Sequence, residues 1–294
     1  MNCIFIINPY SGSKKTKKIT NIINDHIAGS YKIVYTEYSG HASELAESFA
    51  KDNGNIVVAV GGDGTINEIA RSLVNTNTVM GIIPSGSGNG FARSLNIPLD
   101  TVKAIECLNM PFIKTIDSGK INDKYFFGIC GVGFDALVGA KFQDFGKRGP
   151  LPYFYIGVKE YFKYNYESYE IEENGNTDKY EPLLIAVANT SQYGNGASIA
   201  PQANPSDGYL DLCVLNKMKS GDAIKNIPLL FNGKIKQSPF YLHKRIKSII
   251  IRRKNKKGYY HIDGEPFLYD GDLNITIVPS SLKVCVPLKH KKNE

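Results

Sequence analysis

Tryptophan is absent from the 294-residue chain, and cysteine is scarce. No C-x-x-C pair and no cluster of cysteine with histidine occurs, so a zinc site is not expected. The wide spacing of the cysteines favours reduced, mostly buried thiols, as in a cytoplasmic protein. They are Cys3, Cys107, Cys130, Cys213 and Cys285.

Long apolar runs are also missing. No stretch approaches the roughly 18 apolar residues of a membrane-spanning helix. The N-terminal stretch MNCIFIINP has a short apolar run and no basic leader, which predicts a strand rather than a signal peptide. We therefore expect a cytoplasmic protein that does not cross a bilayer.

The overall composition is that of a globular protein. Hydrophobic residues make up 42% of the chain and charged residues 21%, enough to bury a core in one large domain or two modest ones. The net charge of +7 favours anionic partners such as nucleotides, nucleic acid or an acidic membrane surface. Charge alone does not choose among them.

Apolar strands and amphipathic helices alternate in the first third of the chain. This rhythm predicts an α/β domain built on a doubly wound, mostly parallel sheet. Strands are predicted at 3–9, 31–36, 55–60 and before Pro84, and helices at 17–28, 41–52, 65–75 and after Gly90.

The pattern changes near Asp117, where short strands separated by turn residues predict a β-rich, antiparallel C-terminal domain. Strand pairs are expected around Asn122–Asp123 and Asn174–Gly175, with helices at about 153–164 and 222–231. The predicted domains are 1–116, which residues 281–294 are a candidate to complete, and 117–280.

Three glycine-bearing turns follow predicted strands of the first domain, at 8–12, 61–65 and 84–90. Ligands of open parallel sheets bind beyond the carboxyl ends of the strands, and glycine lets a phosphate approach backbone N–H groups. Neither GxxxxGK[ST] nor a GxGxxG after the first strand is present. Each turn alone could simply permit a tight strand–helix connection, but three at one edge favour a phosphate cradle.

The motifs GGDGTINE, NPYSG, YTEYSGHA and PSGSGNGFA, followed by GVGFDA, NPSDGYLDL and IDGEP, together resemble the soluble diacylglycerol kinase family. That family includes sphingosine and ceramide kinases and bacterial lipid kinases. The resemblance runs from Asn8 to Glu265, although GGDGT alone is shared with NAD kinases. It implies an NAD kinase/diacylglycerol kinase-like two-domain fold, with ATP on the first domain and the active site in the cleft between domains.

The resemblance also implies which residues bind ATP. Ser87 stands where the family often has threonine and keeps the hydroxyl, and Glu68 is a candidate near the nucleotide. The implied nucleotide-binding residues are Asn8, Pro9, Tyr10, Ser11, Gly12, Thr36, Gly61, Gly62, Asp63, Gly64, Thr65, Ile66, Asn67 and Ser87.

A base is needed to activate a lipid hydroxyl, and the resemblance places it in HIDGEP. Glu265 is favoured as the proton acceptor, with Asp263 close behind and Asp63 as a further catalytic residue. Residues two apart point to the same side in an extended segment. The alternative is a hairpin turn with solvated carboxylates.

The resemblance further implies a structural Mg²⁺ held by the Asp207 carboxylate and the backbone carbonyls of Asn204 and Tyr209, linked through water to Asp63. A hard cation with oxygen ligands suits this set. A separate Mg²⁺ would accompany ATP.

Two segments are candidates for peripheral contact with the anionic inner face of a membrane. One is a basic run, which is alternatively a solvated hairpin tip. The other, 145–162, is either an interfacial helix or core packing, and the sequence favours the core. No nucleic-acid recognition motif appears. The basic run comprises Arg252, Arg253, Lys254, Lys256 and Lys257.

These observations predict an ATP-dependent lipid kinase acting on diacylglycerol or a sphingoid or ceramide-type lipid. The alternatives are NAD kinase and a non-catalytic nucleotide-binding module. PSGSGNGFA is slightly closer to the sphingosine and ceramide kinase branch. The lipid and the oligomeric state are not readable from the sequence, and a homodimer is one open alternative.

Overall fold

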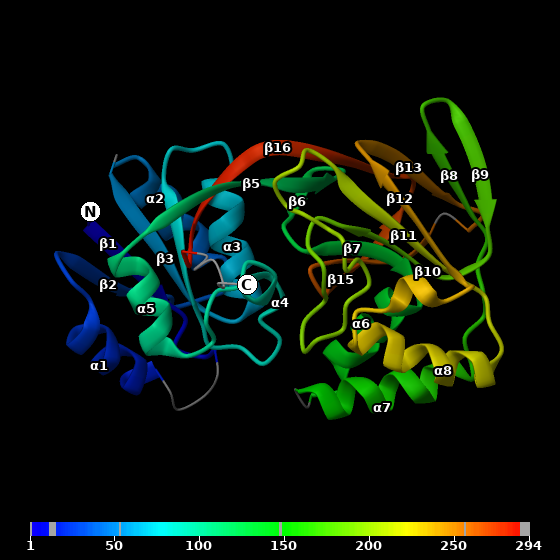
Figure 1. The fold of residues 1–294 in the computed structure, drawn as a ribbon, viewed down its shortest axis with the longest axis horizontal. Coiled ribbons are helices and arrows are strands. Elements are labelled where there is room, and N and C mark those ends of the chain that lie inside the picture. The colour runs from blue at the N-terminus through cyan, green and yellow to red at the C-terminus, as the bar shows by residue number, and fades with distance from the viewer. Residues whose placement is uncertain (1, 12–15, 53, 147–148, 256, 289–294) are drawn as a thin grey trace, which may run out of the picture. The chain divides into compact units, whose positions relative to one another are not determined.

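The computed structural model describes residues 2–11, 16–52, 54–146, 149–255 and 257–288. Strands and helices alternate through the first 116 residues. The chain folds into two compact units (Figure 1). Unit 1 is drawn from Met1–Ile116 and Ser280–Glu294, and unit 2 is Asp117–Pro279. The chain passes between them in two strands, β5 (Phe112–Ile121) and β16 (Leu273–Val286).

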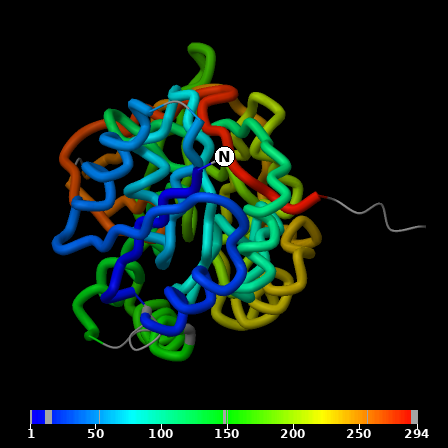
Figure 2. The backbone as a smooth tube through the Cα atoms, turned by 90° about the vertical axis from the view of Figure 1, so that its left-hand side faces the viewer, coloured from blue at the N-terminus to red at the C-terminus, as the bar shows by residue number. Residues whose placement is uncertain are grey.

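Unit 1 is a parallel sheet in the order β2-β1-β3-β4-β16. Figure 2 shows the red end of β16 beside the cyan segments of this unit, in agreement with its pairing with β4. The elements are β1 (Asn2–Ile7), α1 (Thr16–His26), β2 (Tyr31–Tyr35), α2 (His41–Ala50), β3 (Asn55–Gly61), α3 (Asp63–Leu73), β4 (Val79–Pro84), α4 (Gly90–Ser94) and α5 (Thr101–Asn109).

Helices cover both faces of this sheet, because its central strands are apolar on both sides. In β4 every residue is buried, and in β3 all but the first. Side chains of α1 and α5, such as Ile23 and Ile105, pack with Phe5 and Val58 in one core cluster. Helices α2 and α3 pack together against β3. The doubly wound α/β prediction is confirmed.

Unit 2 is antiparallel and β-rich, as predicted. One sheet has the order β12-β11-β10-β7-β14-β15, and β16, β13, β8 and β9 pair in the other. The remaining elements are β6 (Lys124–Phe126), β7 (Ile129–Gly133), α6 (Phe134–Asp144), α7 (Pro150–Tyr161), β8 (Tyr169–Glu173), β9 (Asn176–Tyr180), β10 (Pro182–Ala188), β11 (Leu210–Asn216), α8 (Ser220–Phe231), a 3₁₀ turn at Ile235–Gln237, β12 (Tyr241–Ile246), β13 (Ser248–Arg253), β14 (Lys257–Ile262) and β15 (Glu265–Asp270).

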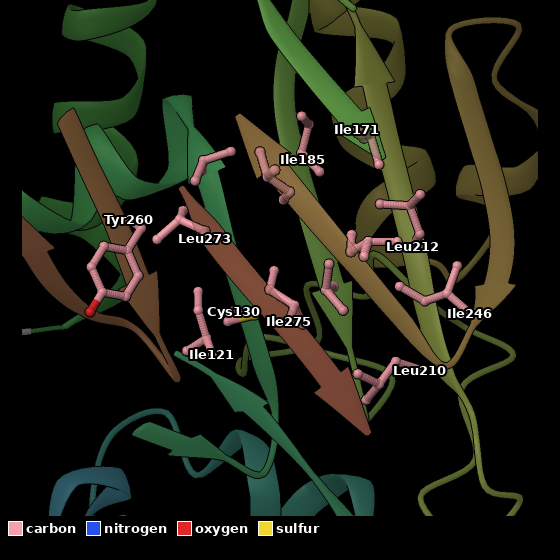
Figure 3. Packing of buried hydrophobic residues seen from close by; sticks show 14 of the residues in the cluster. Ile121, Cys130, Ile171, Ile185, Leu210, Leu212, Ile246, Tyr260, Leu273 and Ile275 are labelled. Carbon is pink, nitrogen blue, oxygen red and sulfur yellow. The ribbon is translucent and has the colours of Figure 1, made fainter. Parts of the chain in front are cut away.

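Apolar side chains from both sheets of unit 2 form one core. Figure 3 shows Ile171 and Ile275 from one sheet facing Ile185 and Leu212 from the other. Strand β10 alternates within this arrangement: Ile185 contributes to the sandwich core, whereas the neighbouring residues 184 and 186 join a second cluster with side chains of α8. All of β10 is therefore buried.

The structure has turns at both predicted positions, 122–123 and 174–175. Asn122 joins β5 to β6 with a φ of 49°, and Asn174 and Gly175 join β8 to β9 with φ values of 51° and 81°. Both central residues of the second turn have positive φ, which matches the right-handed twist of a hairpin. Asparagine and glycine tolerate that region best.

Helices α5 and α6 and strand β12 lie in segments for which no helix or strand was predicted. In α6 the buried positions are Ala136, Val138, Gly139 and Ala140. Ala136, Gly139 and Ala140 have helical spacing, but such small residues give only a weak apolar signal in the sequence, which explains the omission.

The expectation that 145–162 packs into the core is wrong. Helix α7 exposes Leu151 by 81% and Phe154 by 52%, and Phe162 just beyond it is 70% exposed. Of its large apolar residues only Ile156 is buried. Among the residues that the structure describes, none of the helices has the length and apolar character needed to cross a bilayer.

Candidate functional site

A pocket of about 260 Å³ lies in unit 1, where β1 and β2 end. It brings together three of the predicted nucleotide residues, Asn8, Tyr10 and Thr36, with Glu68, and it adds Glu37, which was not predicted. The full lining is Asn8, Tyr10, Thr36, Glu37, Tyr38, Ser39, Ala42 and Glu68. Two carboxylates make this pocket suitable for hydrogen-bond donors and unsuitable for phosphate.

The glycines of the next two turns lie against one another. A Cβ on Gly86 would come within 2.7 Å of the Gly62 Cα atom, and one on Gly61 within 2.6 Å of the Thr65 Cβ. The contact of the two turns therefore leaves no room for a side chain at Gly86, and the Thr65 side chain leaves none at Gly61. Gly64 differs, because a Cβ there would meet no protein atom within 4 Å. The space over Gly64, in the first turn of α3, is open.

The Asp63 carboxylate holds the turn after β4. It accepts hydrogen bonds from the backbone N–H groups of Asn89 (2.8 Å) and Gly90 (2.9 Å). Burial raises the pKa of the Asp63 carboxyl above its ordinary value of 3.8, while these N–H bonds act to lower it. The motifs suggest a catalytic role for Asp63 but not this structural one, because its partners are 26 and 27 residues away.

The other predicted nucleotide residues differ in what they expose. Asn8 donates from its side chain to the Thr65 hydroxyl at 3.0 Å, which ties the first turn to α3. The Ile66 and Asn67 side chains are buried, so Ile66 offers a ligand only its backbone. Ser87 is exposed. Gly12 lies outside the described residues.

In unit 2, Asp263 and Gly264 form the two-residue turn of the β14–β15 hairpin, with φ values of 50° and 85°. The extended segment assumed for Asp263 and Glu265 is thus wrong. The Asp263 carboxylate accepts three hydrogen bonds from the backbone N–H groups of residues 127–129, at 3.0, 2.7 and 2.9 Å. Glu265, the first residue of β15, is exposed. The two acids therefore have different surroundings.

A buried hydrogen-bonded group next to this hairpin was missed. The Asp135 carboxylate, in the first turn of α6, accepts from the Tyr193 hydroxyl at 2.8 Å and lies 3.0 Å from His261 Nε2. Gly131 leaves room for this pair, because a Cβ there would come within 3.0 Å of His261 Nε2. Burial and the nearby Asp135 charge raise the pKa of Tyr193 well above 10.0. The GVGFDA motif, which contains Asp135, was the sequence signal that could have pointed to this group.

The predicted metal residues lie in one loop before β11. Asp207 accepts from the Tyr209 N–H at 3.1 Å and pairs with Arg245 at 2.8 Å, and the Arg245 guanidinium also stacks over the Tyr209 ring. The Asn204 carbonyl accepts from the Ser206 N–H at 2.8 Å. Oxygen donors of this kind fit Mg²⁺, but Arg245 is a competing cation for the one carboxylate.

The basic run is not a continuous exposed surface. Arg252 pairs with Glu172 and Asp272, and Arg253 is 7% exposed on the inward face of β13, so the expectation of a surface run is wrong for Arg253. Lys254 and Lys257 are exposed. Lys256 lies outside the described residues.

Comparison with known families gives two adjoining matches. Residues 2–121 match the family described as diacylglycerol kinase catalytic domain. Residues 128–286 match the YegS C-terminal NAD kinase beta sandwich-like domain. The two follow one another along the chain.

Individual proteins agree with these families. The chain is 28% identical over 272 residues to a diacylglycerol kinase of Bacillus subtilis (strain 168), covering 88% of each. It is 28% identical over 291 residues to a diacylglycerol kinase of Staphylococcus haemolyticus (strain JCSC1435), covering 96% of this chain and 87% of that one. A crystal structure of a diacylglycerol kinase from Bacillus anthracis str. Sterne has the same fold, with a TM-score of 0.72 at 19% identity over 98% of this chain and 97% of that chain.

Proposed function

Since this chain belongs to the diacylglycerol kinase catalytic-domain family and carries the YegS-type C-terminal domain, we propose that it transfers the γ-phosphate of ATP to the hydroxyl of a membrane lipid. Diacylglycerol is the first acceptor to test, because similar proteins are named diacylglycerol kinase. A sphingoid or ceramide-type lipid is the second.

The nucleotide binds to unit 1 in this proposal. The pocket at Asn8 and Thr36 receives the nucleoside, whose amino and hydroxyl groups donate to Glu37 and Glu68. The triphosphate extends over the first turn of α3, where the open space at Gly64 admits a phosphate and the helix N-terminus favours its charge. The nucleoside and the triphosphate are assigned to different places because the carboxylates of the pocket would repel the phosphates.

The observation that carries the proposal is the difference between Asp263 and Glu265. Three N–H donors already occupy the Asp263 carboxylate, so it stabilises the hairpin rather than accepting a further proton. Glu265 is exposed directly beyond the turn. Glu265 therefore takes the proton of the lipid hydroxyl as its oxygen attacks the γ-phosphorus and the bond to the β-phosphate oxygen breaks.

Mg²⁺ has two roles here. One ion accompanies ATP and offsets its charge. The other is held by Asp207 and the carbonyls of Asn204 and Tyr209, which are hard oxygen ligands. Arg245 would compete with this second ion, because its guanidinium lies 2.8 Å from the Asp207 Oδ2 atom.

Membrane contact is made by the exposed apolar side chains of α7 and α8. The two helices lie along the same side of unit 2 in Figure 1, and the Tyr161 hydroxyl at the end of α7 donates to the Met218 carbonyl just before α8 at 3.0 Å. Exposed lysines accompany the apolar residues, which suits an anionic lipid surface. The apolar residues are Leu151, Phe154, Tyr155, Val158, Phe162, Ile224, Ile227 and Phe231, and the lysines are Lys159, Lys163, Lys219 and Lys225.

An ATP-coupled assay of the purified protein with diacylglycerol, sphingosine, ceramide and NAD tests the proposal. We expect phosphorylation of a lipid, identified by mass spectrometry of the product. Phosphorylation of NAD alone, or no turnover with the whole panel, would overturn it.

A further inference from the structure

One buried side chain, Asn189, joins the hairpin of the proposed base to the loop of the proposed metal ion. It follows β10 directly and is 1% exposed. Its Nδ2 donates to two backbone carbonyls, those of Asp117 at 2.9 Å and Phe127 at 3.0 Å. Its backbone N–H donates to the Gly128 carbonyl at 2.8 Å.

One side of this connection leads to Glu265. Asn189 binds the carbonyls of Phe127 and Gly128, and residues 127–129 donate all three of their N–H groups to the Asp263 carboxylate. The Asp263 N–H in turn donates to the Ile129 carbonyl at 2.8 Å. The position of the turn that precedes Glu265 is thus set by the segment that Asn189 binds.

The other side leads to Asp207. Asp117 is 2% exposed and contacts the metal loop twice. Its N–H donates to the Pro205 carbonyl at 2.6 Å, and its carboxylate accepts from the Gly208 N–H at 2.8 Å. Asn189 therefore fixes the strand to which the loop around Asp207 is bound.

The two Nδ2 hydrogen bonds are what distinguishes Asn189 from an apolar residue at the same position. Its Oδ1 is buried and has no hydrogen-bond partner among the described residues, which costs free energy. An amide is needed only for the two Nδ2 bonds, and these join segments that are 10 residues apart in sequence, at 117 and 127.

We propose that Asn189 is a positioning residue that keeps Glu265 and the Asp207 metal loop in one fixed arrangement. This inference rests on the proposed function of both segments. It predicts that loss of the Nδ2 donors disturbs the two together, while leaving the nucleotide residues of unit 1 unaffected.

The test uses the full-length chain with Asn189→Leu and Asn189→Asp, both of which lose the donors. Asn226→Leu is the matched control, because Asn226 is also buried, donates from Nδ2 to the Asp222 carbonyl at 2.8 Å and has an unpaired Oδ1. In variants that retain a cooperative melt, we expect kcat to fall about tenfold or more and the half-saturating Mg²⁺ concentration to rise about threefold, with KM for ATP within about twofold. Unchanged kcat and Mg²⁺ dependence in the Asn189 variants would overturn the proposal.

Hydrogen exchange tests the same connection without turnover, and in the wild-type chain. Mg²⁺ should slow amide exchange of residues 204 and 206–209 and, through Asn189, of residues 127–129. Slowing confined to the loop would overturn the proposal. If Mg²⁺ changes the exchange rates of neither segment, the proposed metal site is wrong, and the Asn189 variants then test the connection by themselves. Asn189→Leu should then speed exchange at both Gly128 and Gly208 relative to Asn226→Leu, and an effect at neither or only one would count against the connection.

Discussion

The backbone N–H of Asn89 donates to the carboxylate of Asp63 at 2.8 Å, so the turn after β4 is held by the first residue of α3. Because burial raises the pKa of Asp63, the folded state binds the proton of the Asp63 carboxyl group more tightly than the unfolded state does. The contribution of Asp63 to stability is therefore present below pH 3.8 and is lost as the pH rises through the raised value. The free energy of unfolding of wild type relative to Asp63→Asn should accordingly fall over that window. Denaturant unfolding of both proteins at a series of pH values measures this, and a constant difference would contradict it.

Glu265→Gln and Asp263→Asn should separate catalysis from stability. Glu265→Gln removes a proton acceptor that is exposed, so we expect turnover to fall about 10²–10⁴-fold with ATP affinity and Tm nearly unchanged. Asp263→Asn leaves at least one of three buried N–H donors without an acceptor, which should cost at least about 2 kcal/mol. Lipid phosphorylation, calorimetric ATP titration and thermal melts distinguish the two. Collapse of nucleotide affinity in Glu265→Gln would show that the proposed role is wrong.

Arg245 should compete with Mg²⁺ for Asp207. Arg245→Met removes the guanidinium that lies 2.8 Å from the carboxylate, so the half-saturating Mg²⁺ concentration should fall, whereas Asp207→Asn should raise it. Arg252→Met, which breaks ion pairs elsewhere in the unit, serves as the control and should leave it unchanged. Magnesium titrations of activity that coincide for all four proteins would remove Asp207 from the metal site.

Gly86→Ala and Gly64→Ala should affect different properties. At Gly86 the added Cβ would come within 2.7 Å of the Gly62 Cα, which predicts a loss of about 1–3 kcal/mol of stability from overpacking. At Gly64 no protein atom is within 4 Å, so Tm should not fall. If a phosphate occupies that space, Gly64→Ala weakens ATP binding nonetheless. Unchanged ATP affinity in a stable Gly64→Ala protein would place the phosphate elsewhere.

Phe154→Ser and Phe162→Ser should each weaken binding to vesicles that contain anionic lipid. A phenylalanine transferred from water into an apolar phase contributes about 1.5–3 kcal/mol, which corresponds to about tenfold or more in affinity. Phe112→Ser, at a 48% exposed phenylalanine in unit 1, is the matched control. Vesicle co-sedimentation measures the effect. Equal losses for all three variants would mean that the α7–α8 residues have no special part in membrane contact.

The fold was predictable to a large extent because periodicity reports burial. The strand–helix rhythm predicts the parallel sheet of unit 1, and Asn174–Gly175 predicts a hairpin that is present. Arg253 shows an available signal that was overlooked: it continues the inward-facing row of Ile249 and Ile251 on β13, where every second residue is buried. Helix α6 gave a much weaker signal, because most of its buried residues are alanine or glycine.

The motifs indicated which residues matter at the candidate site, but they did not indicate their partners. Asp263 binds amides 134–136 residues away, and no local spacing reports a contact of that range. The same holds for Asp135, whose partners Tyr193 and His261 come from other elements. Hydrogen bonds between distant segments follow from tertiary structure, which a single sequence does not display.

Strand β16 also has a consequence for biosynthesis. Its residues Lys283 and Val284 pair in parallel with Val79 and Met80 of β4, so the outer neighbour of β4 is translated only after the whole of unit 2. On the ribosome, β4 therefore keeps one unpaired edge until unit 2 and β16 have been translated. We expect a nascent chain stalled after residue 116 to be more sensitive to proteolysis than one released with β16 in place, and the two units to mature together rather than in turn.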